Sequence, residues 1–188
     1  DKPDGKDKQS WCLIRDAVAK ADPHVDFSSY SRYIFMYAGP GEETSGNPDD
    51  IWYVRWSGLS ISTNDNGGAF KVTHGAIVPD IQAGGYGSLG SVTHEFGHEL
   101  GLPDLYGYSG EIGHWDTMCS GNWNNKMNTP AQLSSYSRIL QGWYWSSKIR
   151  TISPGTAELL MLDPLEDATA TVQVIKLNVG SDYYLIEA

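Results

Sequence analysis

The chain carries at residues 94–104 the run His94-Glu95-Phe96-Gly97-His98-Glu99-Leu100-Gly101-Leu102-Pro103-Asp104. The two histidines are four positions apart, slightly more than one helical turn, so both imidazoles leave the same face of a helix. Two neutral imidazoles on one face can hold one Zn²⁺. Glu95 follows the first histidine and can reach a water on that metal without being a ligand, as a general base must.

The residues after His98 indicate where a third metal ligand comes from. Gly101 permits a left-handed turn, and Pro103 prevents the helix from continuing. The chain should then return Asp104 toward the metal, which makes three protein ligands and leaves one position open. We therefore predict a catalytic Zn²⁺ site with His94, His98 and Asp104 as ligands. The alternatives are a helix with two ordinary surface histidines, or a distant glutamate as third ligand, which the Leu-Pro-Asp run at 102–104 disfavours.

A second motif follows at residues 114–123, His114-Trp115-Asp116-Thr117-Met118-Cys119-Ser120-Gly121-Asn122-Trp123. The elongated zinc motif resembles that of the metzincin metallopeptidases, and the second motif resembles their Met-turn, with Met118 as an apolar floor under the imidazoles. For Met118 the alternative is ordinary core packing. Together with a Pro-led helix ending at Trp143, the pattern is similar to the immune inhibitor A family of secreted peptidases. The resemblance is dense from about Gly85 to Trp143 and looser elsewhere.

The resemblance implies an enzyme that cleaves protein or peptide substrates. We expect a secreted zinc metalloendopeptidase, in which a metal-activated water attacks the peptide bond and Glu95 is the general base. The alternative is a catalytically inactive relative that serves as a binding or adhesion module, and an intact Glu95 weighs against it. Metzincin-like folds bind substrate along an exposed sheet edge, for which Gly75–Pro79 is the best candidate. An interior strand is the alternative for this segment.

Composition restricts the partners. The formal net charge is −10, with only 13 Lys and Arg among 188 residues, so the surface repels nucleic acid and anionic membranes. No stretch approaches the roughly 20 apolar residues of a membrane span. We expect an extracellular monomer that also binds structural Ca²⁺ through acidic residues, although none matches an EF-hand and solvated carboxylates are the alternative. The candidate residues are Asp49, Asp50, Asp65, Asp163 and Asp167.

The chain has two cysteines, Cys12 and Cys119. In an exported protein an even number of cysteines indicates a disulfide, so we predict a Cys12–Cys119 bridge. Two buried free thiols are the alternative, and zinc binding by cysteine is disfavoured because no C-x-x-C pair exists.

The fold expected from these patterns is α+β and metzincin-like, in a single catalytic domain over residues 1–188. An N-terminal lobe to about residue 101 should hold a mixed sheet and the active-site helix, and an irregular lobe from about 102 should hold the Met-turn, a helix and strands. Because the chain stops directly after a strand, we expect it to be truncated at its C-terminal end. Helices are predicted at 10–21, 88–100 and 129–143, and strands at 33–38, 51–56, 60–63, 70–73, 76–78, 171–179 and 183–187.

Overall fold

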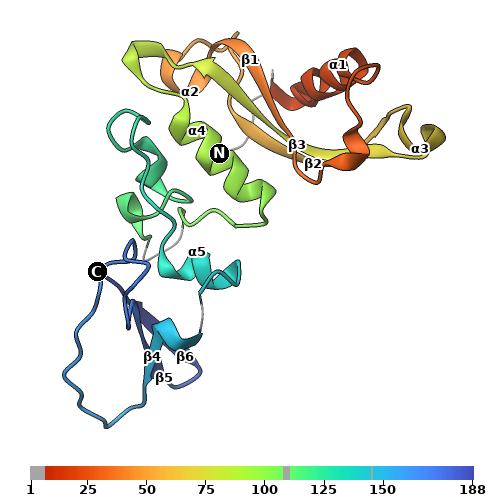
Figure 1. The fold of residues 1–188 in the computed structure, drawn as a ribbon. Coiled ribbons are helices and arrows are strands. Elements are labelled where there is room, and N and C mark those ends of the chain that lie inside the picture. Colours follow the sequence, from red (N-terminus) through yellow and green to blue (C-terminus); the bar gives the residue numbers. More distant parts are fainter. Residues whose placement is uncertain (1–6, 108–110, 145) are drawn as a thin grey trace. The chain divides into compact units, whose positions relative to one another are not determined.

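The computed structural model describes residues 7–107, 111–144 and 146–188, and it has an α+β fold with two small mixed sheets (Figure 1). The chain forms two compact units, residues 1–132 and 133–188, which are described separately below. No helix in the described ranges has the length and apolar character that crossing a bilayer requires. The predicted organisation as one catalytic domain with two lobes stays a prediction.

The first unit is built on a three-stranded sheet in the order β1-β3-β2, comprising β1 (Ile34–Pro40), β3 (Lys71–Ile81) and β2 (Val54–Ser62). The middle strand pairs parallel with β1 and antiparallel with β2; Ala76, for example, lies opposite both Ile34 and Arg55. The predicted substrate edge at Gly75–Pro79 is therefore wrong. This segment is buried throughout, as is typical of a strand with neighbours on both sides.

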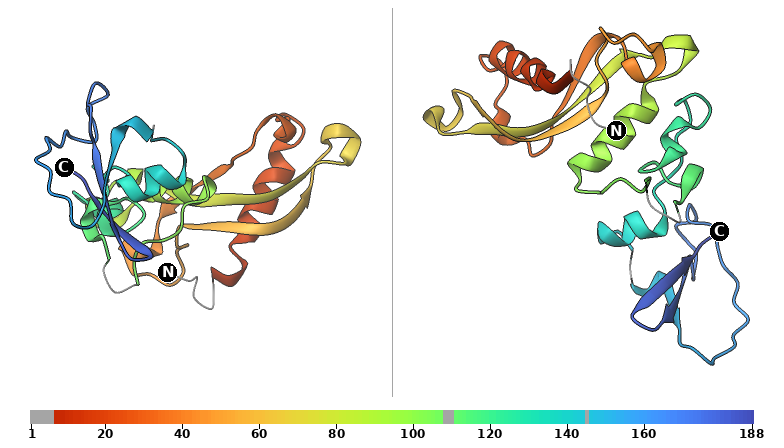
Figure 2. Two further views of the ribbon diagram at one scale, coloured as in Figure 1. Left: turned by 90° about the horizontal axis from the view of Figure 1, so that it is seen from below. Right: turned by 180° about the vertical axis from the view of Figure 1, so that it is seen from behind.

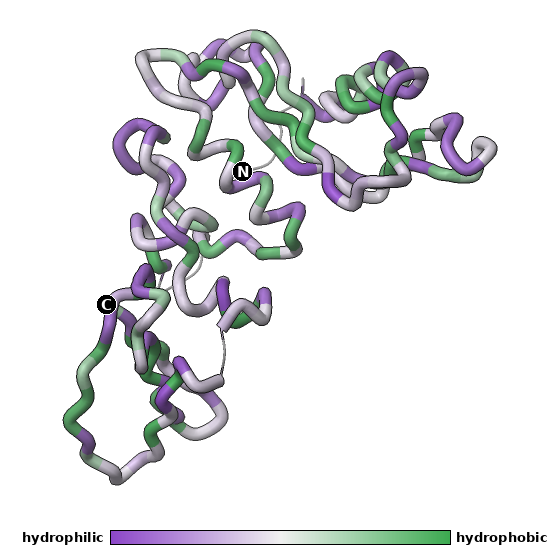
Figure 3. Tube along the Cα trace, viewed as in Figure 1, coloured by the Kyte–Doolittle hydropathy of each residue, from purple (hydrophilic) through white to green (hydrophobic). Residues whose placement is uncertain are grey.

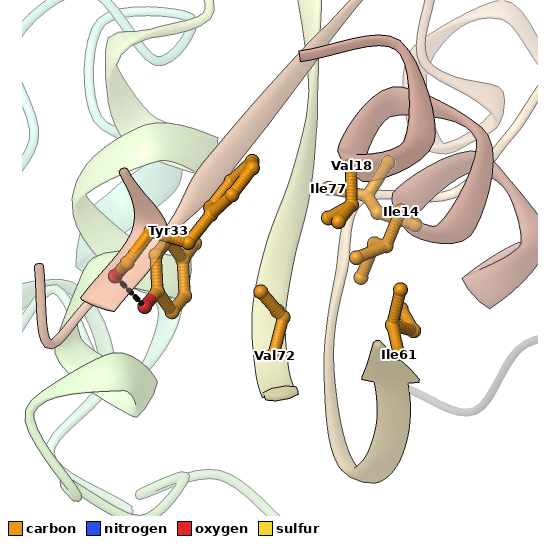
Figure 4. Close-up of a cluster of buried hydrophobic side chains, with 7 residues drawn as sticks. Ile14, Val18, Tyr33, Ile61, Val72 and Ile77 are labelled. Carbon is orange, nitrogen blue, oxygen red and sulfur yellow. Dashed lines mark hydrogen bonds between the residues drawn. The ribbon is translucent and has the colours of Figure 1, made fainter. Parts of the chain in front are cut away.

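The two faces of this sheet bury different helices. Ile77 of β3 packs with Ile14 and Val18 of α1 (Trp11–Ala21), which forms one core cluster (Figure 4). The next residue, Val78, packs in a second cluster with Val92 of α4 (Leu89–Glu99). Because successive side chains of a strand point to opposite faces, α1 and α4 cover opposite sides of the sheet. Figure 3 shows the alternation of hydrophobic and hydrophilic residues along α1 that this one-sided packing requires.

The separation of these two helices explains why the predicted disulfide is wrong. Both cysteines are free thiols in the structure. Cys12 lies on α1, on one side of the sheet, whereas Cys119 lines a cavity bordered by α4 on the other side. A bridge needs Cα atoms within about 7 Å of each other, which an intervening sheet prevents.

Several predicted elements of the first unit form with altered bounds. The helices predicted at 10–21 and 88–100 are α1 and α4, and the strands predicted at 70–73 and 76–78 join into β3. The strands predicted at 51–56 and 60–63 correspond to one strand, β2, whose register shifts between Ser57 and Ile61. Gly58 takes a left-handed φ of 73° at that irregularity, so the residues that signalled a break form a bulge instead. Two short helical turns, α2 (Glu42–Ser45) and α3 (Asp65–Gly68), complete the connections.

The helix predicted from residue 129 begins six residues later, in the second unit. Helix α5 spans only Ser135–Leu140, not residues 129–143. The backbone amide of Ala131 donates to the carbonyl of Gly121 at 2.9 Å, so this stretch is held in a non-helical conformation despite its Thr-Pro start.

The strands of the second unit form a separate sheet in the order β4-β5-β6, with β4 (Ile149–Ile152), β5 (Val174–Val179) and β6 (Asp182–Ile186). The first two strands run parallel and the last two antiparallel. The two strands predicted here, 171–179 and 183–187, are thus present with small shifts. A long irregular connection joins β4 to β5 (Figure 2), and the Gln173 side chain donates to carbonyls of Pro164, Leu165 and Asp167 within it.

Candidate metal centre

Helix α4 packs tightly against the segment that carries the Met-turn motif. A Cβ built on Gly97 would overlap the Sδ atom of Met118, and one built on Gly90 would overlap the carbonyl oxygen of Asn122. The side chain of Met118 is fully buried at this contact. Glycine at these two helical positions therefore lets the second motif approach the back of the helix that carries the histidines.

The two imidazoles of α4 lie face to edge, with ring centroids 4.7 Å apart and planes at 86°. The Nδ1 of His94 hydrogen-bonds the carbonyl oxygen of Thr117 at 2.8 Å, and the Nδ1 of His98 hydrogen-bonds the carbonyl oxygen of Leu102 at 2.8 Å. A carbonyl can only accept, so each Nδ1 carries the proton and donates it. In the neutral imidazole this arrangement leaves Nε2 with a free lone pair, the state in which histidine binds metals.

Asp104 is returned to these imidazoles by the turn that the sequence predicted. Gly101 takes a left-handed φ of 92° directly after the helix. The Oδ1 atom of Asp104 lies 3.3 Å from the Nε2 of His94 and 3.1 Å from the Nε2 of His98. This oxygen is buried and has no hydrogen-bond donor in the described residues. Two imidazole nitrogens and one carboxylate oxygen therefore converge on one point, and this donor set can hold a cation in place of a shared proton.

Glu95 lies beside the two histidines. Its side chain is buried, and its Oε2 has no hydrogen-bond partner among the described residues. Ligand atoms of His94, Glu95 and His98 all lie within 4.8 Å of one another. Burial raises the pKa of Glu95 to about 7, although the nearby imidazoles act to lower it. A carboxyl group with a pKa near neutrality can both accept and return a proton.

A cavity of about 530 Å³ opens over this cluster. Its walls come from the start of β2, from α4, from the turn that carries Asp104 and from the segment after Met118. Asn122 and Trp123, from the end of the second motif, also lie in this wall. The lining residues are Trp52, Tyr53, Val54, Arg55, His94, Glu95, His98, Gly101, Leu102, Pro103, Asp104, Tyr106, Cys119, Ser120, Asn122 and Trp123.

Two tyrosines support the imidazole of His94. The ring of Tyr106 stacks on it with centroids 6.3 Å apart and planes at 17°, and the ring of Tyr53 approaches it edge-on at 6.1 Å. The hydroxyl of Tyr53 accepts a hydrogen bond of 3.0 Å from the side-chain amide of Asn122. Sequence analysis missed Tyr53 because it lies just before β2, some forty positions before His94.

A buried ion network lies at the C-terminal end of α4. The side chain of Glu99 is fully buried; its Oε1 accepts from the Nε of Arg55 at 2.8 Å, and its Oε2 lies 2.6 Å from the Nδ1 of His74. Sequence reasoning missed both Arg55 and Glu99. Tyr53 and Arg55 are two positions apart within the strand predicted at 51–56, and this spacing was the available signal that the two side chains share a face.

The predicted Ca²⁺ sites have no support. The described residues contain one group of metal-binding side chains with suitable spacing, at residues 94, 95 and 98. The carboxylates of Asp65, Asp163 and Asp167 instead accept hydrogen bonds from backbone amides of nearby loops. These groups stabilise turns, as the alternative interpretation holds.

Comparison with known proteins gives a family-level match over this region. Residues 11–147 match the family described as immune inhibitor A peptidase M6, catalytic domain. Immune inhibitor A of Bacillus thuringiensis subsp. alesti is 30% identical over 163 residues, which cover 65% of this chain and 23% of that protein. The pre-pro-metalloprotease PrtV of Vibrio cholerae serotype O1 (strain M66-2) is 31% identical over 164 residues, 67% of this chain and 18% of that protein.

The match confirms the resemblance read from the two motifs. The chain spans about a fifth of the length of these relatives. The matched region contains the sheet, helix α4, the turn to Asp104 and the Met-turn segment. The chain therefore belongs to the immune inhibitor A peptidase M6 family, and what it matches is the catalytic domain of that family.

Proposed function

We propose that this chain is the catalytic part of a secreted zinc metalloendopeptidase of the metzincin type. The observation that carries the proposal is the convergence of His94 Nε2, His98 Nε2 and the Asp104 carboxylate on one point, while each Nδ1 hydrogen-bonds a backbone carbonyl. Family membership implies a metal at such a site. Imidazole nitrogens with one carboxylate, beside an open cavity, are a donor set that suits catalytic zinc.

The side chains divide the catalytic work. Zinc held by His94, His98 and Asp104 would supply Lewis acidity to the scissile carbonyl and to water. Glu95 removes a proton from the attacking water and delivers it to the leaving amine as the peptide C–N bond breaks. The carbonyls of Thr117 and Leu102 hold the two imidazoles in the tautomer that binds metal.

The position of the cavity favours an extended peptide as substrate. Strand β2 is an edge strand of its sheet within the described residues, and residues 52–55 at its start line the cavity. A peptide that adds along this edge would place its carbonyls next to Glu95. This edge replaces Gly75–Pro79 as the proposed binding strand. The acidic net charge of −10 fits a protein that works in the open medium, and we expect a monomer.

An inactive binding module is disfavoured as the function. A module without chemistry has no use for a buried carboxyl whose oxygen is left without a partner, because such a group costs stability. Glu95 is held in that state within 4.8 Å of the ligand atoms of His94 and His98. The cost is understandable if the group serves a reaction.

The test separates binding from chemistry in one preparation. The full chain should hold one zinc per molecule by elemental analysis, cleave a quenched fluorescent peptide, and lose this activity with a zinc chelator. Glu95→Ala should keep the zinc and lose hydrolysis, because the base is removed while the ligands stay. Glu166→Ala, which alters an exposed carboxylate in the second unit, is the matched control and should retain activity. Near-normal turnover by Glu95→Ala, or activity that chelators do not affect, would overturn the proposal.

A further inference from the structure

Arg55 occupies the wall of the cavity beside the metal ligands. It is the second residue of β2 and lies two positions after Tyr53, which directly precedes the strand, so both side chains point to the same side of the sheet. Tyr53 contacts the ring of His94, and Arg55 reaches Glu99 near the end of the same helix. The guanidinium therefore borders the cavity near the C-terminal end of α4.

The guanidinium is only partly used by the fold. Its Nε donates to Oε1 of Glu99 at 2.8 Å, and the other oxygen of that carboxylate is taken by His74. Over the described ranges, no other residue hydrogen-bonds the Nη1 and Nη2 nitrogens of Arg55. The side chain remains 28% exposed and lines the cavity. The forked end of Arg55, which matches the two oxygens of a carboxylate, is thus available to a ligand.

Arg55 is also the one lysine or arginine among the described lining residues. The acidic groups of the cavity are Glu95 and Asp104, and the chain as a whole has a net charge of −10. A metal ion held by His94, His98 and Asp104 would offset these charges at the reaction centre, so Arg55 is the cationic side chain that an acidic substrate residue meets beside it. A neutral or basic side chain gains nothing from the guanidinium.

We propose that Arg55 is a specificity-determining residue that binds an aspartate or glutamate side chain of the substrate, at one position beside the scissile bond. The inference rests on the proposed peptidase function and adds an acidic peptide as its preferred substrate class. Glu99 and His74 hold the guanidinium in place, so little side-chain entropy is lost when a carboxylate binds. A purely structural role, in which Arg55 only neutralises the buried Glu99, is the competing explanation.

The experiment compares paired peptides that differ only by Glu or Gln at one position, moved in turn along both sides of the cleavage site. The measured quantity is the ratio of kcat/KM for the two members of each pair. This ratio does not depend on the active fraction of a preparation, so partial unfolding of a variant does not distort it. The variants are Arg55→Gln, Arg55→Lys and, as a matched control, Arg15→Gln, whose arginine lies on α1 and pairs with Asp16.

At one position the unmodified chain should favour Glu by about fivefold to tenfold, because a charge-assisted bidentate contact forms there. Arg55→Gln should bring the ratio to about one, Arg55→Lys should keep part of it, and Arg15→Gln should not change it. The preference should also shrink with added salt. A ratio near one at every position, or a preference that survives Arg55→Gln, would overturn the inference.

A binding measurement tests this inference independently of the proposed peptidase function. In the Glu95→Ala background, fluorescence anisotropy of the same paired peptides gives a ratio of dissociation constants without any cleavage. A Glu preference that disappears with Arg55→Gln supports the role of Arg55 even if the chain cleaves nothing. Equal binding of both peptides, or no binding of either, refutes it whatever the activity.

Discussion

Gly90→Ala should destabilise the chain although alanine is the better helix former. A Cβ at this position would overlap the backbone carbonyl of Asn122 and lie 2.8 Å from the Cβ of Met127. Ordinary contacts begin near 3.4 Å, so Met127 alone must retreat by about 0.6 Å in a closely packed interior. Overpacking against such rigid neighbours costs about 3 kcal/mol, at the upper end of the usual range. Alanine returns about 1 kcal/mol of helix propensity, so the net loss is about 2 kcal/mol.

The assay is thermal unfolding by calorimetry in excess chelator, so that metal binding does not contribute to the measured stability. A loss of about 2 kcal/mol corresponds to a Tm lower by roughly 4–8 °C for a chain of this size. Gly97→Ala should cost less, because the obstacle there is the flexible side chain of Met118. Leu89→Ala, at a half-exposed position of the same helix, is the control and should change stability little. If Gly90→Ala melts at or above the temperature of the unmodified chain, the close packing of α4 on the Met-turn segment is refuted.

The other predictions concern the ligand, a buried carboxyl and the thiols. Asp104→Ala should weaken zinc binding by more than about 100-fold in a chelator competition, since a ligand matters more than the groups that orient it; unchanged affinity would exclude Asp104 as a ligand. Burial raises the pKa of Glu43, although a hydrogen bond from Gln82 acts to lower it, so the folded state binds the proton more tightly and the chain should lose stability as pH rises above the unfolded value of about 4.3. Glu43→Gln cannot ionise and should lose less stability over that range in denaturant titrations; equal slopes would contradict the shift. Alkylation under denaturing conditions without reductant should label both Cys12 and Cys119, and a linked peptide in the mass spectrum would contradict the free thiols.

Local patterns predicted the convergence of His94, His98 and Asp104 because these residues are close in the chain. The spacing of His94 and His98, the turn at Gly101 and the return of Asp104 all lie within residues 94–104, and each depends on backbone preferences of single residues. Helix α4 accordingly appears within a residue of its predicted bounds. The role of these side chains as zinc ligands stays a proposal.

Features that depend on distant pairings could not be predicted in the same way. Whether Gly75–Pro79 is an edge or a centre depends on β1 and β2, which lie elsewhere in the chain. The helix expected from Thr129 is shortened by a hydrogen bond from Ala131 to Gly121, which no local propensity reveals. The prediction of a disulfide was wrong for the same reason. The even number of cysteines suggested a pair, but the sheet separates Cys12 from Cys119. Arg55 and Tyr53 entered the site only through the pairing of β2.

The tight contact of Gly97 with Met118 has a consequence for the aim of the metal-binding side chains. Successive side chains of an α-helix are offset by about 100° around its axis. The rotation of the helix about that axis therefore decides which side chains face a neighbouring segment. At Gly97 the surface of α4 lacks a side chain, and only that bare surface can face the buried sulfur. A different rotation of α4 would bring a side chain against Met118, so this contact favours the rotation at which both imidazoles line the cavity. The second variable position of the H-E-x-x-H motif, Gly97, is therefore constrained in this fold. The same motif placed in another helix, with no segment packed against that glycine, would lack the contact that orients its histidines.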